Sequence, residues 1–224
     1  MLKKTLAPVI LATAAMMLIP TAARADTISV DAGGGGDYLT ITEAVAAATS
    51  GDTIDIAAGT YYEANIATGF KDLTFVGNSA RDTIVDALDP VNGQISGSIF
   101  YRWKSNDHTF ENLTLQNGVA ADANFGDGGA IATDGVNGTG SLTIRNCAFL
   151  NNYAPDDGGA VENFKNNGSM LVENSLFVGN RADSEGGAFY ADLRNNAVTV
   201  RNSTFSGNST GDTGGGAVVV TTDD

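Results

Sequence analysis

Several residue types that exported or catalytic domains often depend on are scarce in this chain. Among 224 residues there are one cysteine, one histidine, one tryptophan and four prolines. A single cysteine excludes an internal disulfide. No cysteine lies directly after the N-terminal apolar segment, where a lipoprotein would carry its lipid. Basic residues are scarce too, since 12 Lys and Arg against 26 Asp and Glu give a net charge of −14. This charge excludes nucleic acid and anionic membranes as favoured partners.

Residues 1–25 have the pattern of a secretory signal peptide. Two lysines precede an apolar run over residues 6–19, and a small-x-small triplet follows at 23–25. Cleavage before Asp26 removes three basic residues, so the net charge of the remaining chain moves from −14 to −17. No later apolar run is long enough to span a membrane. The pattern predicts a protein that is secreted, periplasmic or on the outer surface of a bacterium.

A repeat of 28 to 30 residues governs the second half of the chain. Gly-Gly-Ala begins at residues 128, 158, 186 and 215, and Phe-x-x-Asn units begin at Phe149, Phe177 and Phe205. A short alternating apolar stretch, typical of a β-strand, precedes each Phe unit. No amphipathic run is long enough for a helix in these units. The repeat predicts an all-β, single-stranded parallel β-helix, a solenoid in which each unit forms one coil.

Equivalent positions of successive coils are expected to stack as ladders about 4.8 Å apart. We predict three ladders: asparagines (Asn112, Asn146, Asn174, Asn202), interior apolar residues (Leu115, Phe149, Phe177, Phe205) and alternating charges (Glu111, Arg145, Glu173, Arg201). The asparagines are expected to pass amide hydrogen bonds between coils, and the charges to fix the register. Lys71 is interpreted as an extension of the charge ladder. Cys147 shares its position with Ser175 and Ser203, which favours an inert interior residue.

The chain divides into two parts after the leader. Residues 26–107 are interpreted as an N-terminal cap and first coils, and residues 108–224 as regular coils of which the last is incomplete. Residues 41–48 predict a short helix that covers a sheet edge, and Phe75 to Asn78 is interpreted as an early Phe unit. The segment 88–107 predicts an inserted loop. The incomplete coil leaves two expectations, end-to-end association of copies or further coils beyond the C-terminus.

Two groups of residues are candidates for a binding site. Tyr101 and Trp103 in the inserted segment are candidates for stacking on sugar rings, or else they cover the coil beneath them. Asp127, Asp157 and Glu185 each precede a Gly-Gly pair, so they are expected to stack. Stacked carboxylates suit calcium, whereas the alternative is that they are solvated turn formers.

His108 aligns with the inward apolar positions of later strands, which favours a structural role over a catalytic one.

The repeat resembles known families. Gly128-Gly-Ala-Ile131, its later variants and the Phe-x-x-Asn units resemble the repeats of the polymorphic outer membrane proteins, and more broadly the pectate-lyase-like β-helix superfamily. This resemblance implies a right-handed β-helix and, for the first family, a surface-displayed role in adhesion. The stretch from Asp37 to Asn65 is similar to the first coil of carbohydrate-active β-helix proteins, including pectin methylesterases. The aspartate pairs of pectin methylesterases and polygalacturonases are not matched here.

Because a fold does not carry an activity with it, we predict an exported or cell-surface repeat protein that is not an enzyme. It is expected to bind a polysaccharide, matrix or cell-surface component in the manner of an adhesin. The alternative is a polysaccharide lyase or hydrolase relative that acts on acidic polysaccharides, with calcium held by the three carboxylates.

Overall fold

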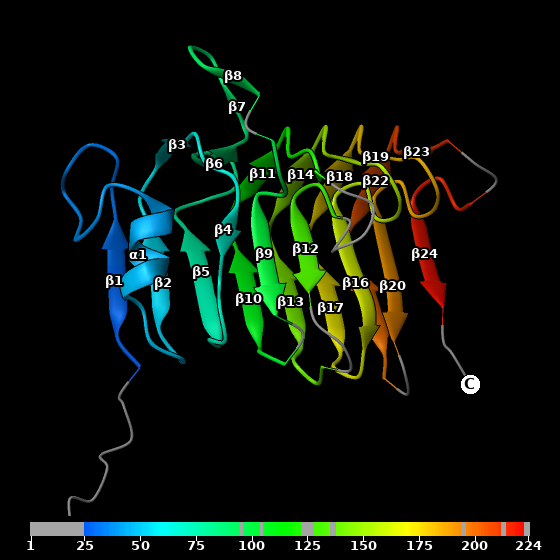
Figure 1. Ribbon diagram of the computed structural model, residues 1–224, viewed down its shortest axis with the longest axis horizontal. Helices are drawn as coiled ribbons and strands as arrows, with labels where there is room; N and C mark the ends of the chain where they lie inside the picture. The colour runs from blue at the N-terminus through cyan, green and yellow to red at the C-terminus, as the bar shows by residue number, and fades with distance from the viewer. Residues whose placement is uncertain are drawn as a thin grey trace, which may run out of the picture.

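A computed structural model describes residues 25–94, 96–103, 105–121, 128–134, 138–193, 196–211 and 214–221. Over these residues the chain is a right-handed parallel β-helix that carries one short helix (Figure 1). The predicted fold class is therefore confirmed.

Three parallel sheets run along the solenoid, because successive coils place one strand in each. Sheet A contains β1 Thr27–Val30, β2 Thr53–Ile56, β5 Leu73–Gly77, β10 His108–Glu111, β13 Leu142–Arg145, β17 Met170–Glu173 and β21 Val198–Arg201. Sheet B contains β3 Gly59–Tyr61, β6 Thr83–Asp86, β11 Thr114–Gln116, β14 Ala148–Leu150, β18 Leu176–Val178 and β22 Thr204–Ser206. Sheet C contains β4 Ile66–Ala67, β9 Phe100–Trp103, β12 Ile131–Asp134, β16 Val161–Asn166, β20 Phe189–Leu193 and β24 Val218–Thr221.

Two smaller elements lie outside these sheets. A corner sheet between sheets B and C contains β15 Tyr153–Ala154, β19 Arg181–Ala182 and β23 Ser209–Thr210. An antiparallel hairpin, β7 Leu88–Asp89 and β8 Gly93–Gln94, stands out from the coils (Figure 1). The inserted segment is thus shorter than predicted, since residues 100–103 form strand β9 of sheet C.

The asparagines between sheets A and B act mainly through their backbone. Asn112, Asn146, Asn174 and Asn202 all have φ between 50° and 59°, a left-handed conformation that asparagine tolerates better than most residues. In this row the side chains of Asn146 and Asn112 are hydrogen-bonded (Nδ2 to Oδ1, 3.2 Å). No other pair of the four has such a bond, so the predicted continuous amide ladder was wrong for this row.

The continuous amide ladder is formed by the last residue of each Phe-x-x-Asn unit. Asn152 Nδ2 donates to Asn180 Oδ1 (3.0 Å), and Asn180 Nδ2 donates to Asn208 Oδ1 (2.9 Å). Each amide also donates to a backbone carbonyl of the preceding coil, as Asn180 does to Phe149 O (3.0 Å). Asn152 and Asn180 are buried, so the ladder satisfies interior backbone groups that would otherwise lack partners.

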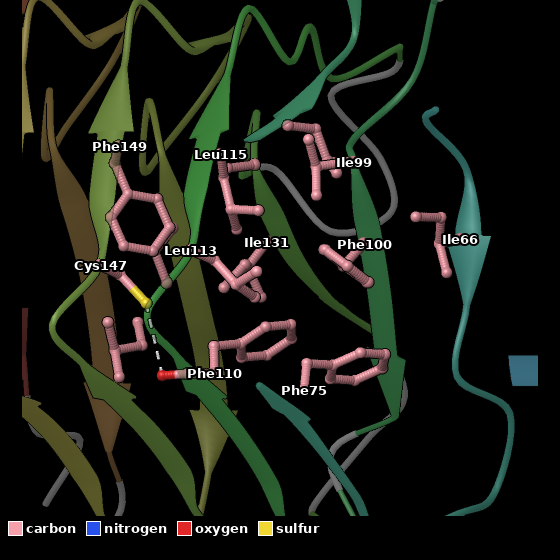
Figure 2. Close-up of a cluster of buried hydrophobic side chains, with 14 of the residues drawn as sticks. Ile66, Phe75, Ile99, Phe100, Phe110, Leu113, Leu115, Ile131, Cys147 and Phe149 are labelled. Atoms are coloured by element: carbon pink, nitrogen blue, oxygen red, sulfur yellow. Dashed lines mark hydrogen bonds between the residues drawn. The ribbon is translucent and has the colours of Figure 1, made fainter. Parts of the chain in front are cut away.

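Aromatic and aliphatic side chains fill the space between the sheets (Figure 2). The predicted Phe ladder is confirmed, with Phe149, Phe177 and Phe205 stacked at ring-centroid distances of 4.6 and 4.8 Å. Phe75 is not part of it. It lies on sheet A opposite Phe110, with a centroid distance of 5.0 Å, so its interpretation as an early Phe unit was wrong. Such stacking adds to the stabilisation from apolar burial.

The alternating charge ladder on sheet A is confirmed. Arg145 forms ion pairs with Glu111 (2.9 Å) and Glu173 (3.5 Å), and Arg201 pairs with the same Glu173 (2.9 Å). Lys71 does not extend it, because Val76 occupies the ladder position next to Glu111.

Lys71 instead belongs to the contacts that hold the helix α1, Ile41–Ala47. Its Nζ donates to Val45 O (2.7 Å) at the helix C-terminus, while Glu63 accepts from the backbone N–H groups of Ile41 (2.8 Å) and Thr42 (2.9 Å) at the N-terminus. Both charges have the sign that the helix dipole favours. The predicted helix over the first coils is confirmed in position, and it contacts β1, β2 and β4.

The Gly-Gly-Ala units form tight corners before sheet C. The first glycine has a positive φ in two units, 65° at Gly158 and 63° at Gly186. The second glycine lies against the next coil, since a Cβ on Gly159 would come within 2.2 Å of Gly187 O. Side chains are therefore excluded at this corner by space as well as by backbone angle.

Candidate functional site

The aromatic candidates Tyr101 and Trp103 lie on strand β9 rather than on an inserted loop. Phe100 and Arg102 are buried beneath sheet C, so by strand alternation Tyr101 points outward. It is half-buried. The two residues pair with Ala132 and Asp134 of the next coil, which places them within a continuous sheet surface.

A row of outward positions follows Tyr101 along sheet C. We call Tyr101, Glu162, Phe164, Tyr190 and Asp192 the sheet C face. Glu162 and Tyr190 are cross-strand partners, and the rings of Phe164 and Tyr190 lie 6.2 Å apart. Glu162, Tyr190 and Asp192 are buried although they lie on the outer side of the sheet. The sequence analysis did not identify these residues. A signal was present, because Glu162 and Tyr190 each hold the fifth position of a Gly-Gly-Ala unit, and strand alternation predicts that this position points outward.

The metal candidates Asp157 and Glu185 are brought together as predicted for stacked positions. The backbone N–H of Glu185 donates to Asp157 Oδ1 (2.9 Å). Burial, with the charges of Asp156 and Glu185 nearby, raises the pKa of the Asp157 carboxyl above its usual value. The third candidate, Asp127, lies outside the described residues. Among the described residues no three His, Cys, Asp or Glu side chains are close enough to hold a metal ion, so calcium binding stays a prediction.

These carboxylates adjoin the sheet C face through Tyr190. Burial raises the pKa of the Tyr190 hydroxyl above its usual value, and the negative charges of Asp157, Asp192 and Glu185 raise it further. The Tyr190 hydroxyl lies 3.2 Å from Thr221 Oγ1. Tyr190 therefore remains a neutral phenol at physiological pH and lies among three carboxylates.

The corner sheet adds a more accessible group beside these carboxylates. The Tyr153 hydroxyl donates to Asp183 Oδ2 (2.6 Å), and Arg181 forms an ion pair with Asp183 Oδ1 (2.7 Å). The guanidinium of Arg181 lies 5.7 Å from the centre of the Tyr153 ring, within the range of a cation–π contact. The side chain of Arg181 is 59% exposed. We call Tyr153, Asp156, Asp157, Arg181, Asp183 and Glu185 the acidic corner.

The histidine and the cysteine are both inside the solenoid. His108 pairs with Leu73 and Leu142 along sheet A, which confirms the predicted inward position. Burial and the neighbouring Arg102 guanidinium lower the pKa of His108 to about 3. Burial raises the pKa of the Cys147 thiol to about 12, and this thiol donates to Phe110 O (3.4 Å; Figure 2). Neither group offers a base or nucleophile to a substrate at neutral pH.

Sequence reasoning did not anticipate the buried Arg102. Its guanidinium donates to Asn163 Oδ1 (3.0 Å), to Asn106 O (3.1 Å) and to the carbonyls of Gly140 and Ser141 (both 3.3 Å). Burial lowers its pKa to about 10. The contacts join β9 to the two following coils, so Arg102 has a structural role in the interior.

Comparison with known proteins relates part of the chain to one repeat family and its fold to one group of enzymes. The Chlamydia polymorphic membrane protein repeat matches residues 174–192. No curated protein matches the chain in sequence. Similar solved structures include a pectin methylesterase from carrot (20% identity, TM-score 0.38, 80% of this chain and 54% of the other). Another is the pectin methylesterase PemA from Erwinia chrysanthemi (15% identity, TM-score 0.39, 81% and 67%).

The chain thus spans about half the length of the carrot enzyme. These likenesses concern the fold and say nothing of the activity.

Proposed function

We propose that this chain is an exported or cell-surface β-helix repeat protein that binds a glycan or matrix component and is not an enzyme. The matched repeat is named for a membrane protein family, which supports a place at the cell surface. No helix within the described residues is long and apolar enough to cross a membrane.

The observation that carries the proposal is the arrangement of Tyr153, Arg181 and Asp183 at the solvent-exposed side of the acidic corner. An aromatic ring, a guanidinium and a carboxylate are held together by bonds of 2.6 and 2.7 Å. Such an amphipathic ring with a few fixed polar groups suits the apolar face and hydroxyl groups of a sugar. Because the three side chains restrain one another, binding costs little further ordering.

A polysaccharide lyase or hydrolase is the second candidate function. It is favoured by one observation, the raised pKa of Asp157 beside Asp156 and Glu185, since perturbed carboxyl groups often mark acid–base sites. The buried states of His108 and Cys147 count against chemistry that uses either residue.

The test compares retention of the protein on a panel of immobilised neutral and acidic polysaccharides. Arg181→Gln is expected to weaken retention at least fivefold. Arg201→Gln is the matched control, because Arg201 on sheet A has a side chain that is 57% exposed and is ion-paired with one carboxylate, that of Glu173, and it is expected to leave retention unchanged. Equal retention of both variants and the unmodified protein would remove the acidic corner from the proposal.

The same polysaccharides distinguish binding from catalysis. Incubation with and without calcium is expected to leave them intact, and ultraviolet absorption from unsaturated products would establish the lyase instead. A melting temperature that is the same in calcium and in chelator would rule out the metal site.

A further inference from the structure

The β7–β8 hairpin exposes apolar side chains away from the body of the solenoid. Figure 1 shows it standing out beyond the rim formed by sheet B. Val91 at its tip is 87% exposed, and Leu88 is 44% exposed. The acidic corner and sheet C face do not include this hairpin.

The tip has a fixed turn. Leu88 pairs with Gln94 and Asp89 with Gly93, which leaves the three-residue loop Pro90, Val91 and Asn92. Proline fixes φ at the start of the loop, and Gly93, directly after the loop, adopts φ of 85°, a conformation that glycine reaches without strain.

The Asp89 carboxylate locks this loop. It accepts from Val91 N (2.7 Å), Asn92 N (3.0 Å) and Asn92 Nδ2 (2.8 Å). These bonds hold the pKa of Asp89 below its usual value, so the tip carries a negative charge beside Val91.

The base of the hairpin is fixed to sheet B. Asp86 accepts from Leu88 N (2.8 Å) and from the side chains of Gln116 (2.7 Å) and Asn117 (2.8 Å). Gln94 Nε2 donates to the carbonyls of Ala87 (3.0 Å) and Asn117 (2.8 Å). The hairpin is therefore fixed both in its own shape and in its attachment to strand β11.

This ordering gains little from burial. An isolated two-stranded hairpin is marginal in water, and each ordered residue loses backbone conformational entropy. A tip that stays in water recovers none of this by apolar contact. The residue-specific bonds instead preorganise the tip, which lowers the entropy cost of binding a partner.

We infer that the β7–β8 hairpin is a contact element for a partner protein, with Pro90 and Val91 inserted into an apolar pocket that has basic side chains at its rim. The apolar tip calls for an apolar pocket on the partner. The negative charge of Asp89, on a strongly acidic chain, favours basic side chains around that pocket. A sugar is a poorer partner, because the tip has no aromatic ring to pack against the apolar face of a sugar. This inference rests on the surface-binding role proposed above.

The experiment measures binding of the labelled protein to cells of the producing bacterium and to an epithelial monolayer. Each surface is used untreated, shaved with protease, or oxidised with periodate to destroy glycans. Val91→Asp is expected to reduce binding to an untreated surface at least fivefold. Leu39→Asp is the matched control, since Leu39 is 54% exposed and lies elsewhere, and it is expected to have no effect. Both variants change exposed side chains and should retain the parent melting temperature.

A second variant, Asp89→Ala, keeps the apolar tip but unlocks the loop, and an intermediate loss of binding is expected. The Val91-dependent binding should disappear on protease-shaved cells and persist after periodate. Equal binding of Val91→Asp and the parent overturns the inference. So does Val91-dependent binding that survives protease treatment but is lost after periodate. Absence of binding of the parent to both surfaces also overturns it. The polysaccharide panel is free of protein, so failure of the proposed glycan binding is recognised separately.

Discussion

The first coils and the later coils of this solenoid are stabilised in different ways. Up to residue 107, individual polar contacts fix individual elements, as Glu63 and Lys71 do at the two ends of α1. From residue 108 onward, the same contact recurs from coil to coil, as in the Asn152–Asn180–Asn208 amide ladder. In a ladder each member binds its neighbours on both sides, so one substitution affects two junctions. In the first coils, one substitution affects one element.

The largest difference between the regions is expected for glycines. Gly159→Ala would place a Cβ 2.2 Å from Gly187 O, and a backbone clash between packed coils cannot be relieved by a side-chain rotation. We expect a loss of about 3 kcal/mol in the free energy of unfolding. Gly69→Ala in the first coils meets no atom within 4 Å and has only its φ of 62° against it, for a loss of about 1 kcal/mol. Denaturant unfolding of both variants measures this, and equal losses would contradict the space argument.

The next test concerns the two rows of asparagine. Asn180→Ala leaves Phe149 O, Asn208 Oδ1 and the Asn152 amide without their buried partner, so we expect a loss of about 3 kcal/mol. Asn174→Gly keeps the left-handed turn at φ of 50° and is expected to change stability by less than about 0.5 kcal/mol. Should Asn174→Gly prove the more damaging, the amide ladder would lie in the row that the sequence first suggested.

Those two rows show what could be predicted from the sequence. The repeat period, the strand pattern and the alternation of charges predicted the fold class, the Phe ladder and the charge ladder. These features were predictable because each arises when one structural unit is repeated along the solenoid axis. Two asparagine rows share the same period, so spacing alone could not tell which turns the backbone and which bonds to its neighbour. Lys71 was misassigned for a related reason, since its carbonyl partners belong to a helix 25 and 26 residues away.

The candidate site was less predictable than the fold. Asp157 and Glu185 were found because they hold one position of the repeat. Tyr153, Arg181 and Asp183 were not recognised as a group, because Tyr153 and Arg181 share a repeat position while differing in chemistry. The β7–β8 hairpin was recognised as an insertion, but its fixed attachment depends on bonds that Gln116 and Asn117 of the next coil donate to Asp86 at its base.

A comparison within sheet A concerns acid stability. His108 stands where later coils have Leu142, Met170 and Val198, and its pKa falls to about 3 in the folded protein from about 6.5 in an unfolded chain. The unfolded state therefore binds the extra proton between these values, and stability falls as the pH drops through this window. Between pH 7 and pH 4 the loss from this group is about 3 kcal/mol.

His108→Leu should remove this loss, while carboxyl groups elsewhere continue to titrate in both proteins. The measurement is urea unfolding of the parent and the variant at pH 7 and pH 4. A parallel decline of the two proteins would show that His108 is not the source of the acid sensitivity.

The smallest effects are expected where single charges hold a single element. Glu63→Gln removes the negative charge from two bonds to the α1 N-terminus, and Lys71→Met removes the cation at its C-terminus. Each should lower the free energy of unfolding by about 1 kcal/mol. The two groups bind opposite ends of one short helix. Loss of either group should make the helix fray, so that removing the other group then lowers the free energy of unfolding by less than it does alone. The double variant is therefore expected to lose less than the sum of the single ones. Additive losses, measured by denaturant unfolding, would mean that the helix ends are stabilised independently and that the first coils are less cooperative than the ladders.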